Sequence, residues 1–432
     1  MHYQLAIECY TECLQLTKSL DDTLDTALVL QKMGEIQLNK LHNYADAKKT
    51  LLDALELQRG VDVDCDGNGM TSLLLLIAQA SAQAKDYNEA LDFYVELVEM
   101  LEASVPKQEQ LLADALYAMG DILAAIDTSP DYELAIEKFN NCADIKRKIF
   151  GTDSEEVANV VYALATVYEQ AGYHEKAIES FSEALRSYKM NNEKGGTVKV
   201  YQALAKLKAT KAIETHSAID SAAAIECYRE ALRIRRQIMS VDDIDLASIL
   251  YEYANLLCTN SDQETALPML EEALQIQKSK CGLKNERVAN ILLSLAGVYV
   301  QQEKYDASLV SLEQVSLIHS FLYPDKSIND CIDMGLCYFL LGKTYLAQSE
   351  FHRAISSYSE CLPLKQNKFG ANSIECAVVH NELGEAYGKV NDWEKAIESL
   401  VAALKIRKKE LGGNSIDYAC SVFNLASEYN MS

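Results

Sequence analysis

Pairs of small residues recur along this chain of 432 residues, and their spacing constrains the fold more than any other feature. The first member of each pair is Ala or Gly, and the second most often follows twelve residues later. Neighbouring pairs are mostly 41 to 47 residues apart, with 42 the commonest spacing. Such a period is typical of stacked copies of one supersecondary unit. The first positions are Gly34, Ala78, Gly120, Ala165, Ala205, Ala254, Ala296, Gly342, Gly384 and Ala426, and the second are Ala6, Ala47, Ala90, Ala135, Ala177, Ala224, Ala266, Ser308, Ala354 and Ala396.

The residues after each second small position indicate how a unit folds. A bulky residue often stands four positions later, as Phe139 does after Ala135, and a small residue seven later, as Cys142 does. Residues at i, i+4 and i+7 share one face of an α-helix, where small side chains let a second helix approach closely. Each unit is therefore predicted to be a pair of antiparallel helices. One pair cannot bury its apolar face alone, so the units must stack into an all-α array.

The residue pattern of these repeats resembles that of the tetratricopeptide repeat, in which small and aromatic residues stand at fixed offsets. Segments 163–168, 294–299 and 382–387 each carry a small residue followed three positions later by Tyr. The period exceeds the usual length of about 34 residues, and in this it is similar to the repeats of kinesin light chains. The resemblance implies a right-handed superhelical solenoid. We expect a single continuous array over 1–432, with a half repeat at 1–20, nine full repeats over about 22–412 and a half repeat at 415–432.

The sixth unit departs most from the pattern. Its small residues, Ala205 and Ala224, are nineteen positions apart, which is seven more than usual. The interpretation is that the seven extra residues lie in the loop between the two helices. Ala212 as the small position is the alternative.

Charge and composition exclude several classes of protein. Lys plus Arg number 40 and Asp plus Glu number 64, so the formal net charge is −24. A chain this acidic binds nucleic acid or an anionic membrane surface poorly, because both present phosphates. The longest apolar run, residues 73–78, is too short to span a bilayer. The twelve cysteines lack metal-binding spacing and the N-terminus lacks a secretion signal, so we expect reduced thiols in a cytoplasmic protein without metal or cofactor.

The resemblance places the first helix of each unit on a concave face, where ligand contacts are expected. Tyrosines three positions before the small residue offer ring surface, and asparagine carboxamides can hydrogen-bond the backbone of an extended peptide. The alternative is that these tyrosines only pack and these asparagines are only solvated. The predicted peptide-binding residues are Tyr117, Asn159, Tyr162, Lys199, Gln202, Lys206, Tyr251, Asn255, Asn290, Asn381 and Asn424.

A basic cluster in and around the sixth unit stands out against the acidic chain. One interpretation is a solvated helix surface whose cations pair with glutamates of the same chain. The other is a binding site for an acidic peptide or phosphopeptide, with Lys199 and Lys206 facing the ligand. The cluster consists of Lys189, Lys194, Lys199, Lys206, Lys208, Lys211, Arg229, Arg233, Arg235 and Arg236.

Two motifs that suggest other chemistry are interpreted as structural. Segment 62–68 matches the first half of a calcium-binding loop, but Leu73 stands where a bidentate Glu is needed. We expect a polar turn from Asp62 to Asp66, with weak calcium binding as the alternative. The sequence Gly342-Lys343-Thr344 ends like a phosphate-binding loop, but no strand precedes it. The seven histidines are scattered, and we expect no catalytic activity.

The predicted function is therefore a non-catalytic scaffold or adaptor that holds peptide segments of other proteins. A narrower form, implied by the resemblance, is a cargo adaptor of the kinesin-light-chain kind. The alternatives are a structural subunit of a stable assembly and a regulatory region of a larger protein. The first is favoured by apolar residues of the last helix without a partner in the chain, which also allow end-to-end assembly: Phe423, Leu425 and Tyr429.

Overall fold

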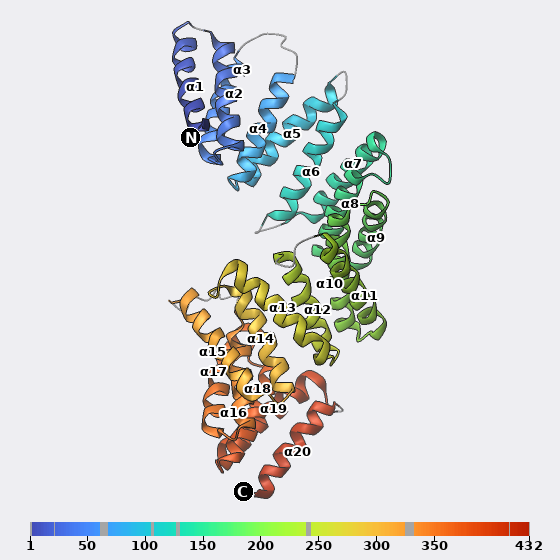
Figure 1. The fold of residues 1–432 in the computed structure, drawn as a ribbon, viewed down its shortest axis with the longest axis vertical. Coiled ribbons are helices and arrows are strands. Elements are labelled where there is room, and N and C mark those ends of the chain that lie inside the picture. Colours follow the sequence, from blue (N-terminus) through green and yellow to red (C-terminus); the bar gives the residue numbers. More distant parts are fainter. Residues whose placement is uncertain are drawn as a thin grey trace. The chain divides into compact units, whose positions relative to one another are not determined.

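The computed structural model describes residues 2–20, 22–60, 68–104, 108–126, 130–238, 243–324, 332–413 and 415–431. These residues form twenty α-helices and no β-strand, which confirms the predicted all-α repeat fold (Figure 1). The chain divides into two compact units, Met1–Cys227 and Tyr228–Ser432, with the boundary inside α11 (Ala218–Ile238). A single continuous array over 1–432 stays a prediction.

The first unit is built from α1 to α10. Their bounds are α1 (His2–Ser19), α2 (Thr23–Asn39), α3 (Tyr44–Arg59), α4 (Asn68–Gln83), α5 (Tyr87–Ala103), α6 (Glu109–Ala125), α7 (Tyr132–Phe150), α8 (Glu155–Gln170), α9 (His174–Met190) and α10 (Lys194–Thr215). The second unit continues with α12 (Ile244–Thr259), α13 (Gln263–Cys281), α14 (Glu286–Gln301), α15 (Tyr305–Leu322), α16 (Met334–Ala347), α17 (Phe351–Phe369), α18 (Ile374–Lys389), α19 (Trp393–Leu411) and α20 (Ile416–Met431).

Helices with even numbers from α2 to α20 are the first helices of the repeats, and helices with odd numbers are the second helices. The two helices of a repeat are held together at the small positions predicted from the sequence. A β-carbon added to Gly120 of α6 would lie 2.7 Å from Cε2 of Phe139 on α7. One added to Gly384 of α18 would lie 2.5 Å from Cγ of Leu400 on α19. These distances are far below van der Waals contact, so the missing side chain is what lets the bulky residue fill the space.

The first helices approach one another more closely than the second helices do. Cα atoms within 8 Å join α6 to α8 and α8 to α10 in the first unit, and join each of α12, α14, α16 and α18 to the next first helix in the second unit. Among the described residues, no comparable set of contacts joins consecutive second helices. Each unit therefore has an inner face formed by first helices and an outer face formed by second helices.

The structure corrects the interpretation of the sixth repeat. Its extra residues do not form a loop, because α10 runs for 22 residues to Thr215 and only two residues separate it from α11. The stretch after Ala205 contains neither Gly nor Pro, so nothing in it interrupts the helix. The helix ends where His216 takes a left-handed conformation with φ 51°. The insertion thus lengthens the helices rather than the turn.

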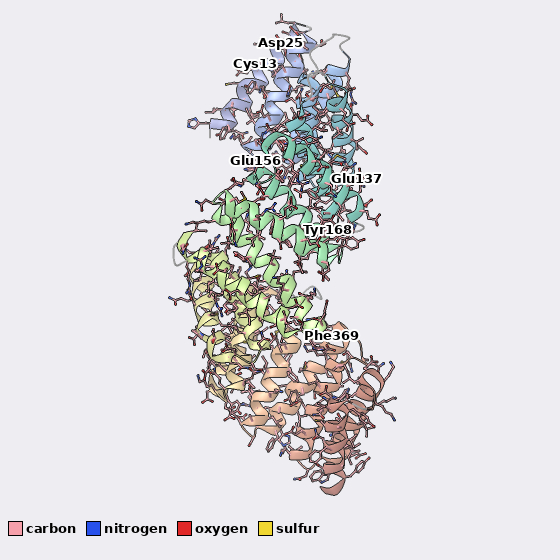
Figure 2. The ribbon with its side chains drawn as sticks, turned by 90° about the vertical axis from the view of Figure 1, so that its right-hand side faces the viewer. Cys13, Asp25, Glu137, Glu156, Tyr168 and Phe369 are labelled. Carbon is pink, nitrogen blue, oxygen red and sulfur yellow. The ribbon has the colours of Figure 1, made fainter. Side chains whose placement is uncertain are left out.

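Several apolar and thiol side chains remain on the surface. Cys13 of α1 is exposed, and so is Phe369 at the end of α17 (Figure 2). On α20, Phe423 is 72% exposed. The cysteines in the described part of the chain are all free thiols. No helix in the described ranges combines the length and the apolar character needed to cross a membrane.

Candidate functional site

Two of the predicted tyrosines are held in place by a phenylalanine of their own repeat. Tyr117 on α6 lies edge-on to Phe139 of α7, with ring centroids 5.3 Å apart. Tyr162 on α8 lies against Phe181 of α9, with ring centroids 5.5 Å apart. Both phenylalanines are fully buried and both tyrosines are half-buried. The tyrosines therefore take part in packing and still leave part of each ring accessible.

The carboxyl group of Asp121 shapes the electrostatics near Tyr117. Burial raises the pKa of Asp121 to about 6. Burial also raises the pKa of Tyr117 to about 12, and the negative charge of Asp121 adds to this shift. The pKa of Tyr162 is raised by burial and then by the charge of Glu169. Both phenol groups are therefore neutral hydrogen-bonding groups at physiological pH.

Asn159 on α8 is already engaged within the chain. Tyr188 of α9 donates a hydrogen bond from its hydroxyl to Asn159 Oδ1, with an O···O distance of 2.6 Å. The ring of Tyr188 also lies against Gly196 of α10, where an added β-carbon would lie 2.5 Å from Cε1. The carbonyl end of this carboxamide is thus fixed, and its amide nitrogen keeps the capacity to donate.

The predicted residues on α10 differ in exposure. Lys199 and Lys206 are exposed and form no ion pair with the described residues, whereas Gln202 is half-buried and interacts within the chain. Burial raises the pKa of Glu169 on α8, and the positive charge of Lys206 offsets part of this shift. Lys206 therefore lies near Glu169, and the two charges belong to one stretch of the inner face.

Much of the remaining basic cluster is paired with acidic groups of the same chain, as one of the two interpretations predicted. Lys211 contacts Glu175 at 2.6 Å, and Arg236 contacts Glu272 at 2.7 Å. Arg235 forms ion pairs with Asp243 and Asp245. Lys189 instead donates to the hydroxyl of Tyr201 at 2.7 Å. Lys199 and Lys206 are thus cations of the inner face that an external ligand can reach.

The second unit carries the other predicted residues. Tyr251 and Asn255 lie half-buried on α12, and Asn290 lies half-buried on α14. Asn424 of α20 donates a hydrogen bond from Nδ2 to Asn381 Oδ1 of α18, at 3.1 Å. This bond joins two consecutive first helices. It leaves the amide nitrogen of Asn381 and the carbonyl oxygen of Asn424 available to a peptide backbone.

Sequence analysis missed a second recurring contact. Tyr358 of α17 donates to Glu382 of α18 at 3.3 Å, and Tyr228 of α11 donates to Glu252 of α12 at 3.5 Å. Burial is the main cause that raises the pKa of Glu382. Both pairs are 24 residues apart, so a search for Tyr and Glu at this offset finds them.

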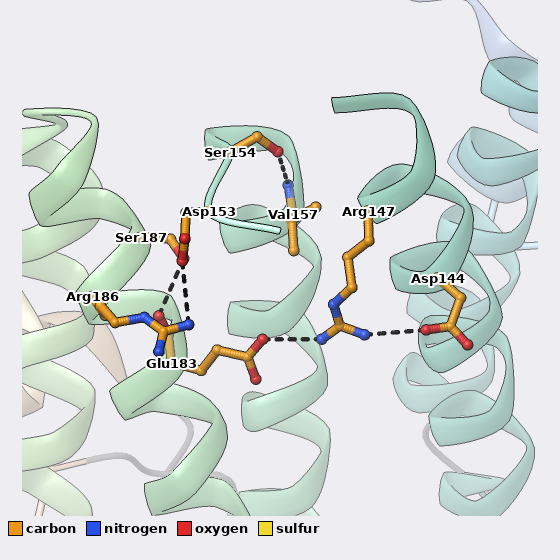
Figure 3. A network of polar contacts seen from close by, with 8 residues as sticks. All are labelled: Asp144, Arg147, Asp153, Ser154, Val157, Glu183, Arg186 and Ser187. Carbon is orange, nitrogen blue, oxygen red and sulfur yellow. Dashed lines mark hydrogen bonds and ion pairs between the residues drawn. The ribbon is translucent and has the colours of Figure 1, made fainter. Parts of the chain in front are cut away.

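The outer face is crossed by ion pairs between consecutive second helices. Arg147 of α7 contacts Glu183 of α9 at 3.0 Å and also Asp144 of its own helix at 3.2 Å, as Figure 3 shows. Arg59 and Glu96 form the matching pair between α3 and α5, and Arg236 and Glu272 between α11 and α13. We call these contacts the inter-repeat ion pairs.

The described residues contain no group of three or more His, Cys, Asp or Glu side chains arranged to hold a metal ion. The segment Asp62–Asp66, where weak calcium binding was the alternative, lies outside the described residues. The inner face offers ring surface, carboxamides and a few charges. This chemistry suits the recognition of a polypeptide.

Comparison with known proteins supports the repeat assignment. A model of the tetratricopeptide repeat family matches residues 131–190, 216–279, 245–319 and 334–409, together more than half of the chain. No curated protein sequence matches.

Solved structures are similar to this chain in fold. The apo form of the quorum sensor NprR from B. thuringiensis is 16% identical, covers 90% of this chain and 99% of its own, and has a TM-score of 0.53. The apo form of RapI is 13% identical, with the same two coverages and a TM-score of 0.58. A putative kinesin light chain from Podosopora anserina, with nearly identical TPR-like repeats, covers 49% of this chain and 95% of its own at 16% identity, with a TM-score of 0.39.

Proposed function

Because this chain belongs to the tetratricopeptide repeat family, we propose that it is a non-catalytic scaffold that binds peptide segments of other proteins along the inner face of its units. The observation that carries the proposal is the arrangement of Tyr117 and Tyr162. Buried phenylalanines fix both rings, and each ring stays half-accessible on neighbouring first helices. A surface ordered before binding does not lose the entropy of ordering itself when a peptide arrives.

The mode of binding follows from the groups on the inner face. The rings of Tyr117, Tyr162 and Tyr251 would pack against ligand side chains. The carboxamides of Asn255, Asn290, Asn381 and Asn424 would hydrogen-bond the peptide backbone, which requires no particular ligand sequence. Lys199 and Lys206 would add a preference for acidic residues. The net charge of −24 argues against nucleic acid as the partner.

A test selects peptides of about 15 residues from a random library against the intact chain and ranks them by affinity. The same peptides are measured against a variant with Tyr117→Ala, Tyr162→Ala and Tyr251→Ala, after circular dichroism has confirmed that it is helical. We expect the variant to lose at least about tenfold in affinity. Equal affinity for both proteins would place binding elsewhere and refute the proposal.

A cytoplasmic cargo adaptor of the kinesin-light-chain kind is the narrower form of this proposal, and the 42-residue spacing supports it. The second candidate function is that of a structural subunit. The exposed apolar side chains of α20 favour it, since Phe423 is 72% and Tyr429 is 58% exposed. End-to-end assembly through such a surface would give complexes that resist high salt, whereas groove binding would be displaced by a competing peptide.

A further inference from the structure

The outer face of α15 carries an apolar stripe. Val310, Leu317 and Phe321 are 55%, 69% and 54% exposed. Spacings of seven and four residues place them along one side of the helix, opposite the buried residues that face the core. The ammonium group of Lys284 lies 3.6 Å from the centroid of the Phe321 ring and borders one end of the stripe. Exposed apolar residues gathered on one side of a helix mark an interaction site more often than scattered residues do.

Hollows lie on both sides of this stripe. One, of about 590 Å³, has apolar walls from Leu274, Leu292 and Leu295 and reaches Gln314 of α15. The other, of about 360 Å³, lies between Leu317 of α15 and the side chains of Leu341 and Tyr345 on α16. The stripe is therefore a ridge between two grooves. That shape suits the side-chain rows of another helix, which pack ridge into groove.

Inter-repeat ion pairs join α3 to α5, α7 to α9 and α11 to α13, and none joins the described residues of α15 and α17. The cation of each pair stands twelve residues after the second small position, as Arg147 and Arg236 do. Its carboxylate stands six residues after the next second small position. At the junction of α15 and α17 the cationic position is Ser320, while the acidic position is still Glu360.

Two carboxylates near α15 form no ion pair with any residue that the structure describes. Glu360 of α17 is exposed and forms no ion pair with any described residue, and it lines the same pocket as Ser320. Glu313 of α15 is also exposed without such a partner and borders the smaller hollow beside Leu317. Glu313 borders the hollow toward α16, and Glu360 lies on α17. Both carboxylates are exposed, so they would attract a cation from outside the chain.

We propose that the outer face of α15 is a second docking surface, distinct from the inner face, and that its occupant is a basic amphipathic helix of another protein. The apolar residues of that helix would pack on Val310, Leu317 and Phe321 and enter the two grooves. Its Lys or Arg residues would meet Glu313 and Glu360, in the place of the cation that Ser320 does not supply. Helices that lay an apolar face into a hydrophobic groove are a common mode of recognition.

The probe for this surface is a synthetic, fluorescently labelled peptide with the length of α15, built from Leu and Lys at helical spacing. Its counterpart replaces every Lys by Glu. Binding to the full chain is followed by fluorescence anisotropy. We expect a micromolar dissociation constant for the basic peptide and at least about tenfold weaker binding of the acidic one.

Variants separate the docking surface from general attraction to an acidic protein. Leu317→Ser changes an exposed residue and should weaken binding at least about tenfold. Ser320→Arg should supply the missing cation to Glu360, and should weaken binding while thermal stability is kept. Glu133→Gln removes an exposed carboxylate of α7 in the first unit and should leave binding within about twofold.

The outcomes decide between clear alternatives. If all three variants bind the peptide as the unchanged chain does, or if Glu133→Gln weakens it as much as Leu317→Ser, attraction is non-specific and the proposal is wrong. Equal binding of the acidic peptide would overturn the assigned charge of the partner. The inner-face variant Tyr117→Ala, Tyr162→Ala and Tyr251→Ala should bind the basic peptide normally, so the two proposed surfaces can fail independently.

Discussion

Gly342 of α16 lies directly against the ring of Tyr358 on α17, which is fully buried. A β-carbon at residue 342 would overlap the ring, so Gly342→Ala must displace Tyr358 or the helix. We expect a loss of about 1–3 kcal/mol in the free energy of unfolding, as for other overpacked cores. Denaturant titration followed by circular dichroism measures it.

The control is Gly297→Ala on α14, where nothing lies within 4 Å of an added β-carbon. Alanine is a better helix former than glycine, so the free energy of unfolding of this variant should rise by about 0.5–1 kcal/mol. The same sign for both variants would show that the contact with Tyr358 is unimportant.

The stability of the chain should depend on the protonation of Asp121. Its folded-state pKa of about 6 lies above the unfolded value of 3.8, so the folded protein binds this proton more tightly. The neutral carboxyl stabilises the fold below pH 3.8, and this contribution is lost as the pH rises to about 6. Asp121→Asn should therefore gain stability relative to the unchanged chain from pH 4 to 6 and keep a constant gain above that. Urea midpoints measured at several pH values would show it, and a difference that does not vary with pH would contradict it.

The binding of acidic peptides should depend on the two exposed lysines of the inner face. The double variant Lys199→Glu and Lys206→Glu should bind an acidic peptide, selected against the intact chain, at least about tenfold more weakly. Calorimetry at low and high salt measures both the affinity and its electrostatic part. Lys208→Glu is a matched control on the same helix. Burial raises the pKa of Cys227 of α11 and the charge of Lys208 partly lowers it, so Lys208 lies toward the second helix. Equal losses for Lys208→Glu would assign the effect to overall charge.

The inter-repeat ion pairs should contribute little to stability. Arg147 and Glu183 are about one-third exposed, and water and salt weaken their attraction. Arg147→Ala should cost less than about 1 kcal/mol in the free energy of unfolding. Thermal denaturation at low and high salt gives the value. A loss as large as that expected for Gly342→Ala would contradict this, because it would mean that the ion pair contributes as much to stability as the packed interior.

The ion pair of Arg235 should matter more because it is better shielded. The side chains of Arg235 and Asp243 are 11% and 15% exposed, and Asp243 also caps the first turn of α12. Asp243→Ala should cost about 1–2 kcal/mol, because it removes a charged hydrogen bond and a helix cap but leaves Arg235 paired with Asp245. Its hydrogen bond with Arg235 lowers the pKa of Asp243, so this stabilisation is lost only as the pH falls below 3.8. Acid titration of the two proteins would show equal stability only at the lowest pH.

The helix pairs could be predicted because each small residue has one steric purpose. Gly120 and Gly384 stand where a side chain of the partner helix needs the space, and this is visible in the sequence as a spacing. The length of α10 could not be predicted from the same spacing. A count of residues between Ala205 and Ala224 does not say whether the extra ones are helical, and only the lack of a helix breaker could have indicated it.

The candidate site was less predictable than the fold. The pattern marks Asn159 as an inner-face residue, but the hydroxyl of Tyr188 that occupies it comes from a different helix, 29 residues away. In the same way, Tyr117 and Tyr251 share a repeat position, yet of these two only the ring of Tyr117 packs against a phenylalanine. Such differences depend on the neighbouring helix, and a spacing rule within one helix does not contain them.

The inter-repeat ion pairs cross the outer face, where consecutive second helices are far enough apart that long side chains bridge them. When a unit bends, distances change most on this outer side and least where the first helices touch, so Arg147 and Glu183 act at the end of a lever arm. Salt that loosens such contacts softens the curvature of the unit without unfolding it. The fit of the inner face to a ligand then becomes sensitive to ionic strength, even for a peptide that carries no charge.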